Sequence, residues 1–541
     1  MPAARRRLVR YASFAGAMLV TLTLAGTSVM AEEAGGERNL PLEFVHNNLE
    51  DAPVAGAVWA AGPALKDGSV ICSVAATADP NVNLSCGPTG PHDETSIAVN
   101  PADPDNMIAG ANDYQLAINP GGHVAASTLS RATVTFDGGA TWTVYPIRTG
   151  GTYQATGDPS VAFDETGNAY YATLGFRFVG PANAQNPDVI VSVSRDGGIH
   201  WVGHRVAQGS GNATSVGDLL DKEYVAAWGD GNAVVTYGDY RLAQKGSTVS
   251  GHLFATVTHD AGETWSKPVL ISGDEPFAFV SVPTVTADGR IFVAYENFNH
   301  FDNGRDDYEV AELDPATGER IAGPFTVDTL IDGFTDYPLA FGRQTYQDSL
   351  FRSWSAGNIA ADPMSGAHLA VAWSDMRNST VPAPDDPYEA VTNSDIVVSQ
   401  SFDHGRTWSH PVALELPGDQ FQGWAAYDAN GALRIGFFDR SYDATNHRYG
   451  YTLATETTAG TLTFGTTELS TARSDPTRDN RWFAATVDPG FPFATTFVGD
   501  YSGIAATPDG GVVAVWTDLR ADVTFAGRTG ADQDMVFATA P

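Results

Sequence analysis

Positive charge is scarce in this sequence. Its 541 residues carry 30 Lys and Arg against 64 Asp and Glu, which gives a formal net charge of −34. The lysines number only four, namely Lys66, Lys222, Lys245 and Lys267. Binding to nucleic acid or to an anionic membrane needs a basic surface that neutralises phosphate. The composition therefore argues against both partners.

Several signatures of cofactor chemistry are also missing. The 12 histidines show no zinc-ligand spacing, and the sequence contains no phosphate loop, nucleophile elbow or dinucleotide fingerprint. We therefore expect no cofactor and no metal. The acidic stretch Asp302-Asn303-Gly304-Arg305-Asp306-Asp307 is the single candidate for Ca²⁺. A solvated surface turn is the favoured interpretation of that stretch.

The first residues resemble an export signal. Arg5, Arg6, Arg7 and Arg10 precede the apolar run Phe14 to Leu24, and small residues lead to Ala31. This order predicts a signal peptide over residues 1–31 and a secreted protein, with an uncleaved anchor as the alternative. Cysteine is rare as well, and the pair Cys72 and Cys86 predicts one disulfide in an oxidising compartment.

A unit made of an apolar strand, an Asp/Gly/Asn turn and a second apolar strand recurs seven times. The copies begin near Ser96, Pro159, Glu223, Pro283, Gly357, Gly423 and Tyr501. Each copy has the alternating pattern and turn residues of a β-hairpin. Recurrence at a near-constant spacing indicates a repeat architecture.

A second pattern, Ser/Thr-x-Asp-x-Gly-x-x-Trp, follows the first in four copies, at residues 135–142, 194–201, 258–265 and 401–408. The Asp carboxylate can accept N–H bonds across its own turn, Gly allows positive φ, and Trp packs against the sheet. We expect a structural role for these residues, which are Asp137, Trp142, Asp196, Trp201, Asp260, Trp265, Asp403 and Trp408.

This second pattern resembles the Asp box of the sialidase superfamily. The resemblance implies an all-β fold, a single β-propeller of four-stranded blades. The seven copies predict seven blades, with the six blades of sialidases as the alternative. Since the last copy ends at a third strand, we expect a segment between Leu40 and Val74 to complete it and close the ring. The expected domains are a signal peptide (1–31), an N-terminal extension with the Cys72–Cys86 loop and closing strand (32–90), and the propeller (91–541).

In this arrangement one face of the propeller collects the ends of second strands and the starts of first strands. Its sequence is rich in groups that bind glycans: arginine forks for carboxylates and aromatic platforms for sugar faces. The candidate ligand-binding residues are Arg241, Arg343, Arg352, Arg377, Arg440, Arg520, Trp354 and Trp424. The alternative is that the repeated Asp-x-Arg motifs pair within or between blades.

The resemblance to sialidases implies an arginine triad, a Tyr nucleophile assisted by Glu, and an Asp acid/base. Tyr501, Asp500, Asp158 and Glu94 are the candidate catalytic residues, with Tyr501 as the nucleophile. One departure matters. Sialidases carry an Arg-Ile-Pro motif ahead of the first Asp box, whereas residues 32–130 contain a single arginine, Arg38, in a different context.

Three functions remain open from the sequence. The first is a secreted glycoside hydrolase that acts on extracellular glycans. The second is a non-catalytic glycan-binding or adhesion propeller, and the absent Arg-Ile-Pro motif favours it. The third is a protein-interaction scaffold, which would expose an apolar patch. In each case we expect a monomer with a glycan, glycoconjugate or protein partner.

Overall fold

The computed structural model describes residues 66–86, 90–118, 124–151, 153–177, 185–211, 217–242, 248–298, 306–331, 337–340, 343–349, 351–379, 389–476, 478, 497–525 and 528–541. Over these residues the secondary structure is entirely β, with 33 strands. No helix of the described chain could cross a membrane. The predicted signal peptide (1–31) lies outside the described residues.

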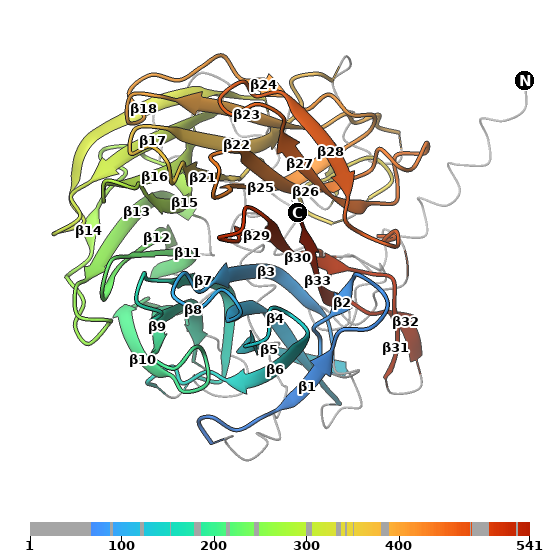
Figure 1. Ribbon diagram of the computed structural model, residues 1–541, viewed down its shortest axis with the longest axis horizontal. Helices are drawn as coiled ribbons and strands as arrows, with labels where there is room; N and C mark the ends of the chain where they lie inside the picture. The colour runs from blue at the N-terminus through green and yellow to red at the C-terminus, as the bar shows by residue number, and fades with distance from the viewer. Residues whose placement is uncertain are drawn as a thin grey trace, which may run out of the picture.

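Seven antiparallel sheets stand around a common axis as the blades of a propeller (Figure 1). In each blade the first strand is innermost, and successive strands pair outward. The first four blades are β3(His92–Val99), β4(Met107–Ile118), β5(Val124–Thr135), β6(Thr141–Pro146); β7(Ala155–Phe163), β8(Ala169–Phe176), β9(Asp188–Ser194), β10(Val202–Ala207); β11(Gly217–Trp228), β12(Asn232–Leu242), β13(Thr248–Thr258), β14(Val269–Leu270); and β15(Ala278–Val285), β16(Ile291–Asn297), β17(Asp306–Leu313), β18(Arg320–Leu330).

The remaining blades and the two short ribbons complete the set. They are β21(Asn358–Ala361), β22(Leu369–Asp375), β23(Asp395–Ser401), β24(Val412–Ala413); β25(Gln420–Tyr427), β26(Leu433–Asp439), β27(Gly450–Glu456), β28(Phe464–Glu468); β29(Gly503–Ala506), β30(Val512–Asp518), β33(Asp534–Ala540); and the ribbons β19(Leu339–Ala340), β20(Arg343–Gln344) and β31(Asp522–Phe525), β32(Arg528–Ala531). The prediction of seven blades is confirmed, and the six-bladed alternative is wrong. We call the face at which first strands begin and second strands end the first-strand face.

An N-terminal strand closes the ring, as predicted, but it lies further along the chain than expected. Strand β2(Val82–Asn83) pairs with β33 and supplies the fourth strand of the last blade. The prediction that a segment between Leu40 and Val74 would do so is wrong. Strand β1(Cys72–Ala75), at the end of that range, pairs instead with β6 and adds a fifth strand to the first blade. The outer strands β6 and β33 would otherwise leave free sheet edges, and each of these edges pairs with its own N-terminal strand.

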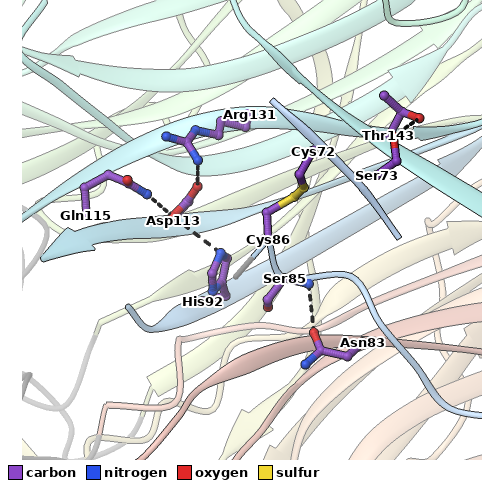
Figure 2. Close-up of a disulfide and its surroundings, with 10 residues drawn as sticks. All are labelled: Cys72, Ser73, Asn83, Ser85, Cys86, His92, Asp113, Gln115, Arg131 and Thr143. Atoms are coloured by element: carbon purple, nitrogen blue, oxygen red, sulfur yellow. Dashed lines mark hydrogen bonds and ion pairs between the residues drawn. A yellow bond between two sulfur atoms is a disulfide. The ribbon is translucent and has the colours of Figure 1, made fainter. Parts of the chain in front are cut away.

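A disulfide joins Cys72, in β1, to Cys86, which follows β2, with Cα atoms 6.1 Å apart (Figure 2). The segment between them crosses the seam between the first and last blades. Met535 N–H donates to Ser85 Oγ (2.9 Å), and Leu84 N–H donates to the Met535 carbonyl. We call residues 72–86 the N-terminal strap. It ties together two blades that are more than 400 residues apart in the chain.

The four Asp-box turns share one hydrogen-bond pattern. Asp137 Oδ1 accepts the Thr141 N–H (2.8 Å), and Asp403 Oδ1 accepts the Thr407 N–H at the same distance. The preceding hydroxyl accepts the N–H of the Gly two residues after the Asp, as with Thr135 and Gly139 (3.0 Å). These bonds lower the pKa of Asp137, with the Thr141 hydroxyl as the largest cause. The carboxylates are used in their own turns, on the face opposite the first-strand face.

Apolar side chains fill the spaces between neighbouring blades. Trp142, the Asp-box Trp of the first blade, is fully buried and packs edge-on against Phe537 of the last blade, with ring centroids 5.0 Å apart. Tyr451 stacks on Trp516 across the next seam, at 4.9 Å. Aromatic pairs of this kind contribute on the order of 1 kcal/mol each beyond the area that they bury. Each blade is therefore held by both neighbours.

Candidate active site

The innermost strands carry a bulge near their start. Pairing with the second strand shifts register between Asp93 and Ser96 in β3, and at the matching points of β7, β11, β15 and β25. The bulged residue has positive φ in all five strands: Glu94 (53°), Asp158 (56°), Lys222 (55°), Val280 (47°) and Gln422 (51°). Positive φ is strained for residues other than Gly. The uncharged Val280 and Gln422 have the same positive φ, so this strain is a property of the fold. Only the charged residues at this position can contribute to chemistry.

Three of these bulged residues meet at the axis. The Lys222 ammonium lies 3.2 Å from Glu94 Oε1 and 3.1 Å from Asp158 Oδ2, and all three side chains are at most 2% exposed. They come from three successive blades. Each side chain reaches the axis because the bulge turns it away from the sheet and toward the centre of the ring.

Asp500 and Arg352 complete this group, which we call the axial cluster. Lys222 Nζ lies 2.7 Å from Asp500 Oδ2. Arg352 holds Asp500 with two bonds, Nε to Oδ1 at 2.8 Å and an η-nitrogen to Oδ2 at 2.6 Å. Burial raises the pKa of Asp500, but the cations Arg352 and Lys222 outweigh it and hold this pKa well below its usual range. Burial would lower the pKa of Lys222, yet Asp158, Asp500 and Glu94 keep it well above the usual value.

Three further buried carboxyls surround the axial cluster: Asp93, Asp221 and Glu223. Burial raises the pKa of Asp221 to about 7, with Lys222 opposing and Asp158 adding to the shift. Burial, reinforced by Asp158, raises the pKa of Glu223 well above the usual value. Burial likewise raises the pKa of Asp93, although Asn112 donates a hydrogen bond to it (3.3 Å). The site therefore holds carboxyls with a lowered pKa and carboxyls with a raised pKa within one small volume.

Some carboxylate oxygens in this volume have no hydrogen-bond partner among the described residues. They are Asp158 Oδ1, Asp221 Oδ2, Asp93 Oδ2 and both oxygens of Glu223. A buried polar atom without a partner costs about 1–3 kcal/mol. Such atoms cluster where a fold keeps groups ready for chemistry or for a ligand.

Three aromatic rings close the axis on one side of the axial cluster. Tyr501 lies 5.6 Å from Tyr224 and 6.3 Å from Trp424, and Trp424 lies 5.7 Å from Tyr224, measured between ring centroids. The Tyr501 hydroxyl donates to the Pro159 carbonyl (3.1 Å). Burial, with Glu94 and Asp158 adding to it, raises the pKa of Tyr501 well above its usual value. The predicted nucleophile thus lies beside the carboxylates as a neutral phenol.

The three rings also line a cavity of about 150 Å³ on the axis. The innermost strands of all seven blades contribute to its wall, with Ser96, Ser160, Val282 and Asn358 among the lining residues. Ser96, Ser160 and Val282 follow the bulge in their strands at the same register position as Tyr224 and Trp424. The cavity therefore lies at the level of the aromatic layer.

The predicted rim arginines separate into two groups. Among those whose side chains the structure describes, only Arg352 reaches the axial cluster. Arg377 binds Asp375 (2.6 Å) on its own strand, and Arg520 binds Asp518 (2.8 Å) in the same way. The sequence left pairing within a blade as the alternative to ligand binding, and the structure shows this pairing for Arg377 and Arg520. Arg520 also donates to Asn81 of the N-terminal strap (2.8 Å).

The other predicted residues lie further from the axis. Arg440 is fully buried and pairs with Asp419 at 3.2 Å, so it holds two chain segments together. Arg241 is exposed on β12. Trp354 is half-buried and packs on Phe279, with ring centroids 5.3 Å apart. Arg343 lies in β20, and its side chain is outside the described residues.

Metal binding finds no support in the described part of the chain, where no group of three or more His, Cys, Asp or Glu could hold an ion. Residues 302–305 of the predicted acidic loop lie outside the described residues, while Asp306 and Asp307 begin β17. Asp307 accepts a hydrogen bond from Thr329 (2.9 Å).

Sequence reasoning brought Glu94, Asp158, Asp500 and Tyr501 to one face, and the structure brings all four together at the axis. The sequence singled out Lys222 only as one of four lysines and Glu223 only as the start of a repeat copy. The structure makes Lys222 the centre of the site. A usable signal was present: in a chain with only four lysines, one is flanked by two acids at a repeat position.

No family model and no curated protein matches the sequence. Among solved structures, the chain is similar to a Hadza microbial sialidase, at 15% identity over 77% of this chain and 75% of that one, with a TM-score of 0.41. It is also similar to the NanB sialidase from Streptococcus pneumoniae, at 8% identity, 87% and 99% coverage and a TM-score of 0.41. An α-L-arabinanase from Penicillium chrysogenum matches at 13% identity, 86% and 98% coverage and a TM-score of 0.39. The fold assignment itself comes from the strand pairing.

Proposed function

We propose that the chain is an exported glycoside hydrolase whose reaction takes place at the axial cluster. One observation carries this proposal: Glu94, Asp158 and Asp500 converge on a single ammonium, within 3.2 Å of it. Any two of the bound oxygens are then no more than roughly 6 Å apart, which is the range in which paired carboxyls cleave a glycosidic bond. The predicted export signal and the acidic, lysine-poor composition support an extracellular place of action.

The roles follow from the protonation of each group. A glycosidase needs one carboxyl that keeps its proton near neutral pH and one that is ionised. Asp221 is not one of the three carboxylates on the ammonium, but it adjoins Lys222 in the chain, and its pKa, raised to about 7 by burial with Asp158 adding to the shift, fits the general acid. Asp158 fits the base or nucleophile, because its Oδ2 is held by Lys222 while its Oδ1 has no partner among the described residues. Asp500, held by Arg352 and Lys222, is a positioning residue that fixes both cations.

A second candidate is a propeller that binds glycans without cleaving them. The burial of the axial cluster favours it, since the side chains of Lys222, Glu94, Asp158, Asp500 and Arg352 are at most 5% exposed. Three carboxylates that share one ammonium are also stable without a substrate. In this interpretation the axial cluster stiffens the ring, and a glycan binds at the first-strand face above it.

Hydrolysis of a panel of chromogenic glycosides, sialosides included, separates the two candidates. The proposed function predicts turnover by the wild-type chain and a loss of at least about 100-fold in kcat for Asp158→Asn, which keeps the shape but removes the base. Asp375→Asn is the matched control, because Asp375 pairs with Arg377 at the end of a second strand and away from the axis. It should keep kcat within about threefold. No turnover of any panel member would rule out the hydrolase and leave the binding function.

The proposed acid also predicts the direction of the pH dependence. Asp221 must be protonated to donate, so kcat should fall as pH rises through about 7. Asp221→Asn cannot donate at any pH and should lose this alkaline limb together with most of kcat. A substrate with a good leaving group, such as a dinitrophenyl glycoside, needs less protonation and should recover part of the rate. A wild-type profile that stays flat between pH 5 and 9 would contradict the assignment of Asp221.

A further inference from the structure

We propose that the axial cavity lined by the aromatic layer is a second site, which takes one neutral sugar or polyol. The innermost strands of all seven blades line the cavity, and no residue of the axial cluster is among the lining residues. Nothing in the proposed hydrolysis uses it. Three properties of its wall decide which ligand it takes: its size, its hydrogen-bond donors and its lack of charge.

The volume of about 150 Å³ fits a single ring. An apolar cavity of this order stays dry and holds benzene, whereas a polar one of the same size is filled by water or by a polar ligand. Oligosaccharides and polymers are too large for it. The candidates are therefore a monosaccharide, a cyclitol or a short polyol.

Two serine hydroxyls that join neighbouring blades also supply hydrogen-bond donors to the wall of the cavity. Ser96 Oγ accepts the Val161 N–H (3.2 Å), and Ser160 Oγ accepts the Val225 N–H (3.1 Å). Each serine fixes the next blade through its oxygen, and its own proton has no acceptor among the described residues. The two hydroxyls, from adjacent blades, can therefore donate to oxygens of a ligand in the cavity.

Asn358 adds a third polar group on the opposite part of the ring. Its Oδ1 accepts the Ala425 N–H (2.7 Å), and its amide donates one proton to the Ala425 carbonyl (2.8 Å). The second amide proton is left to donate. Trp424, Tyr224 and Tyr501 supply the aromatic surface of the same cavity. Hydrogen-bond donors and ring faces around one cavity suit a hydroxylated ring.

Charge decides which hydroxylated ring fits. None of the lining residues is charged at neutral pH, since burial raises the pKa of both tyrosines, Tyr224 and Tyr501, well above the usual value, so the wall offers no partner for a charged ligand. The nearest charges belong to the axial cluster, whose three carboxylates outnumber its two cations. An anionic sugar would be repelled from this end of the cavity. The wall likewise holds no ionised group to pair with a cation, so the site suits a neutral ligand.

Calorimetric titration of the full-length chain tests this inference. Galactose, glucose and myo-inositol are the neutral probes, and galacturonate and glucuronate are the anions of matched size. We expect saturable binding of at least one neutral probe, at least about tenfold tighter than its anion, with a change in tryptophan fluorescence that Trp424→Phe removes. Absence of saturable binding up to about 100 mM, or equal binding of neutral and anionic probes, would overturn the inference.

Two variants place the binding in the cavity. Val282→Phe fills the cavity without removing a hydrogen-bonding group and should weaken binding at least about tenfold. Val285→Phe, three residues further along β15 and outside the lining, should leave binding within about twofold. Equal binding by both variants would place the sugar elsewhere. Because Asp158→Asn should remove turnover and keep this binding, the failure of one proposal is distinguishable from the failure of the other.

Discussion

Replacing Lys222 with methionine should lower the free energy of unfolding by about 3–5 kcal/mol at neutral pH. Lys222 Nζ holds Glu94, Asp158 and Asp500 at 3.2, 3.1 and 2.7 Å, and all these side chains are at most 5% exposed. Methionine has a similar length, so the variant removes the charge and little volume. The three carboxylates would then repel one another in a buried volume, with only Arg352 to compensate.

The pH dependence of this loss has a definite sign. The pKa of Lys222 is raised, so its contribution is present below the unfolded value and lost as pH rises through the higher folded value. The pKa of Asp500 is lowered, so its contribution is present above the unfolded value and lost as pH falls. The difference between wild type and variant should therefore be largest between about pH 5 and pH 10, and should shrink in acid.

Denaturant midpoints and melting temperatures across this pH range measure the difference, and Lys267→Met is the control. Lys267 is exposed, so its replacement should change stability by no more than about 0.5 kcal/mol. Asp158→Asn in the Lys222→Met background should recover part of the lost stability, because it removes one of the repelling charges. A Lys222→Met variant as stable as Lys267→Met would mean that the axial cluster is not an ionised network.

Removal of the disulfide should give the second large effect. The Cys72→Ser, Cys86→Ser double variant should lose about 3 kcal/mol, the value expected when a loop of 14 residues is no longer closed in the unfolded chain. The loss should begin at the seam of the ring. Strand β2 pairs with β33 over only two residues, so it depends on the disulfide to stay in place. Once β2 leaves, β33 becomes a free edge strand.

Hydrogen exchange locates this effect. Amides of β33 that bond to the N-terminal strap, such as that of Met535, should exchange faster in the double variant, while β16 on the opposite side of the ring should keep its protection. Ser73→Ala is the matched control, since it removes only the exposed Ser73–Thr143 hydrogen bond on β1. Uniform acceleration in all blades would show that the N-terminal strap supports the whole fold and not the seam.

Much of the fold could be predicted because it depends on local, repeated patterns. The Asp boxes and the strand–turn–strand units fix the order of strands within a blade, and seven copies give seven blades. The closing strand could not be placed in the same way. Val82–Asn83 is too short for a periodic pattern, and only its partner β33 makes it a strand. From the sequence, Asp375 and Arg377 could equally have bound a ligand. That they pair with each other is decided by packing, which the sequence does not show.

The sequence identified Glu94, Asp158 and Asp500 as residues of the site but missed Lys222, which lies at its centre. Glu94 and Asp158 were found because each is an acid at the start of a first strand. The sequence could not show that a bulge gives them positive φ and turns them toward one cation. The raised pKa of Asp221 was also out of reach, because it arises from burial and from Asp158 of a neighbouring blade.

A crystal structure of the chain with a bound oligosaccharide, chosen from the glycoside panel, tests the central claim most directly. The account predicts a sugar ring on the axis at the first-strand face, with its glycosidic oxygen within hydrogen-bond distance of Asp158 or Asp221. A glycan bound only at the outer strands of a blade, with the Lys222 ion pairs unchanged and no sugar near the axis, would contradict it.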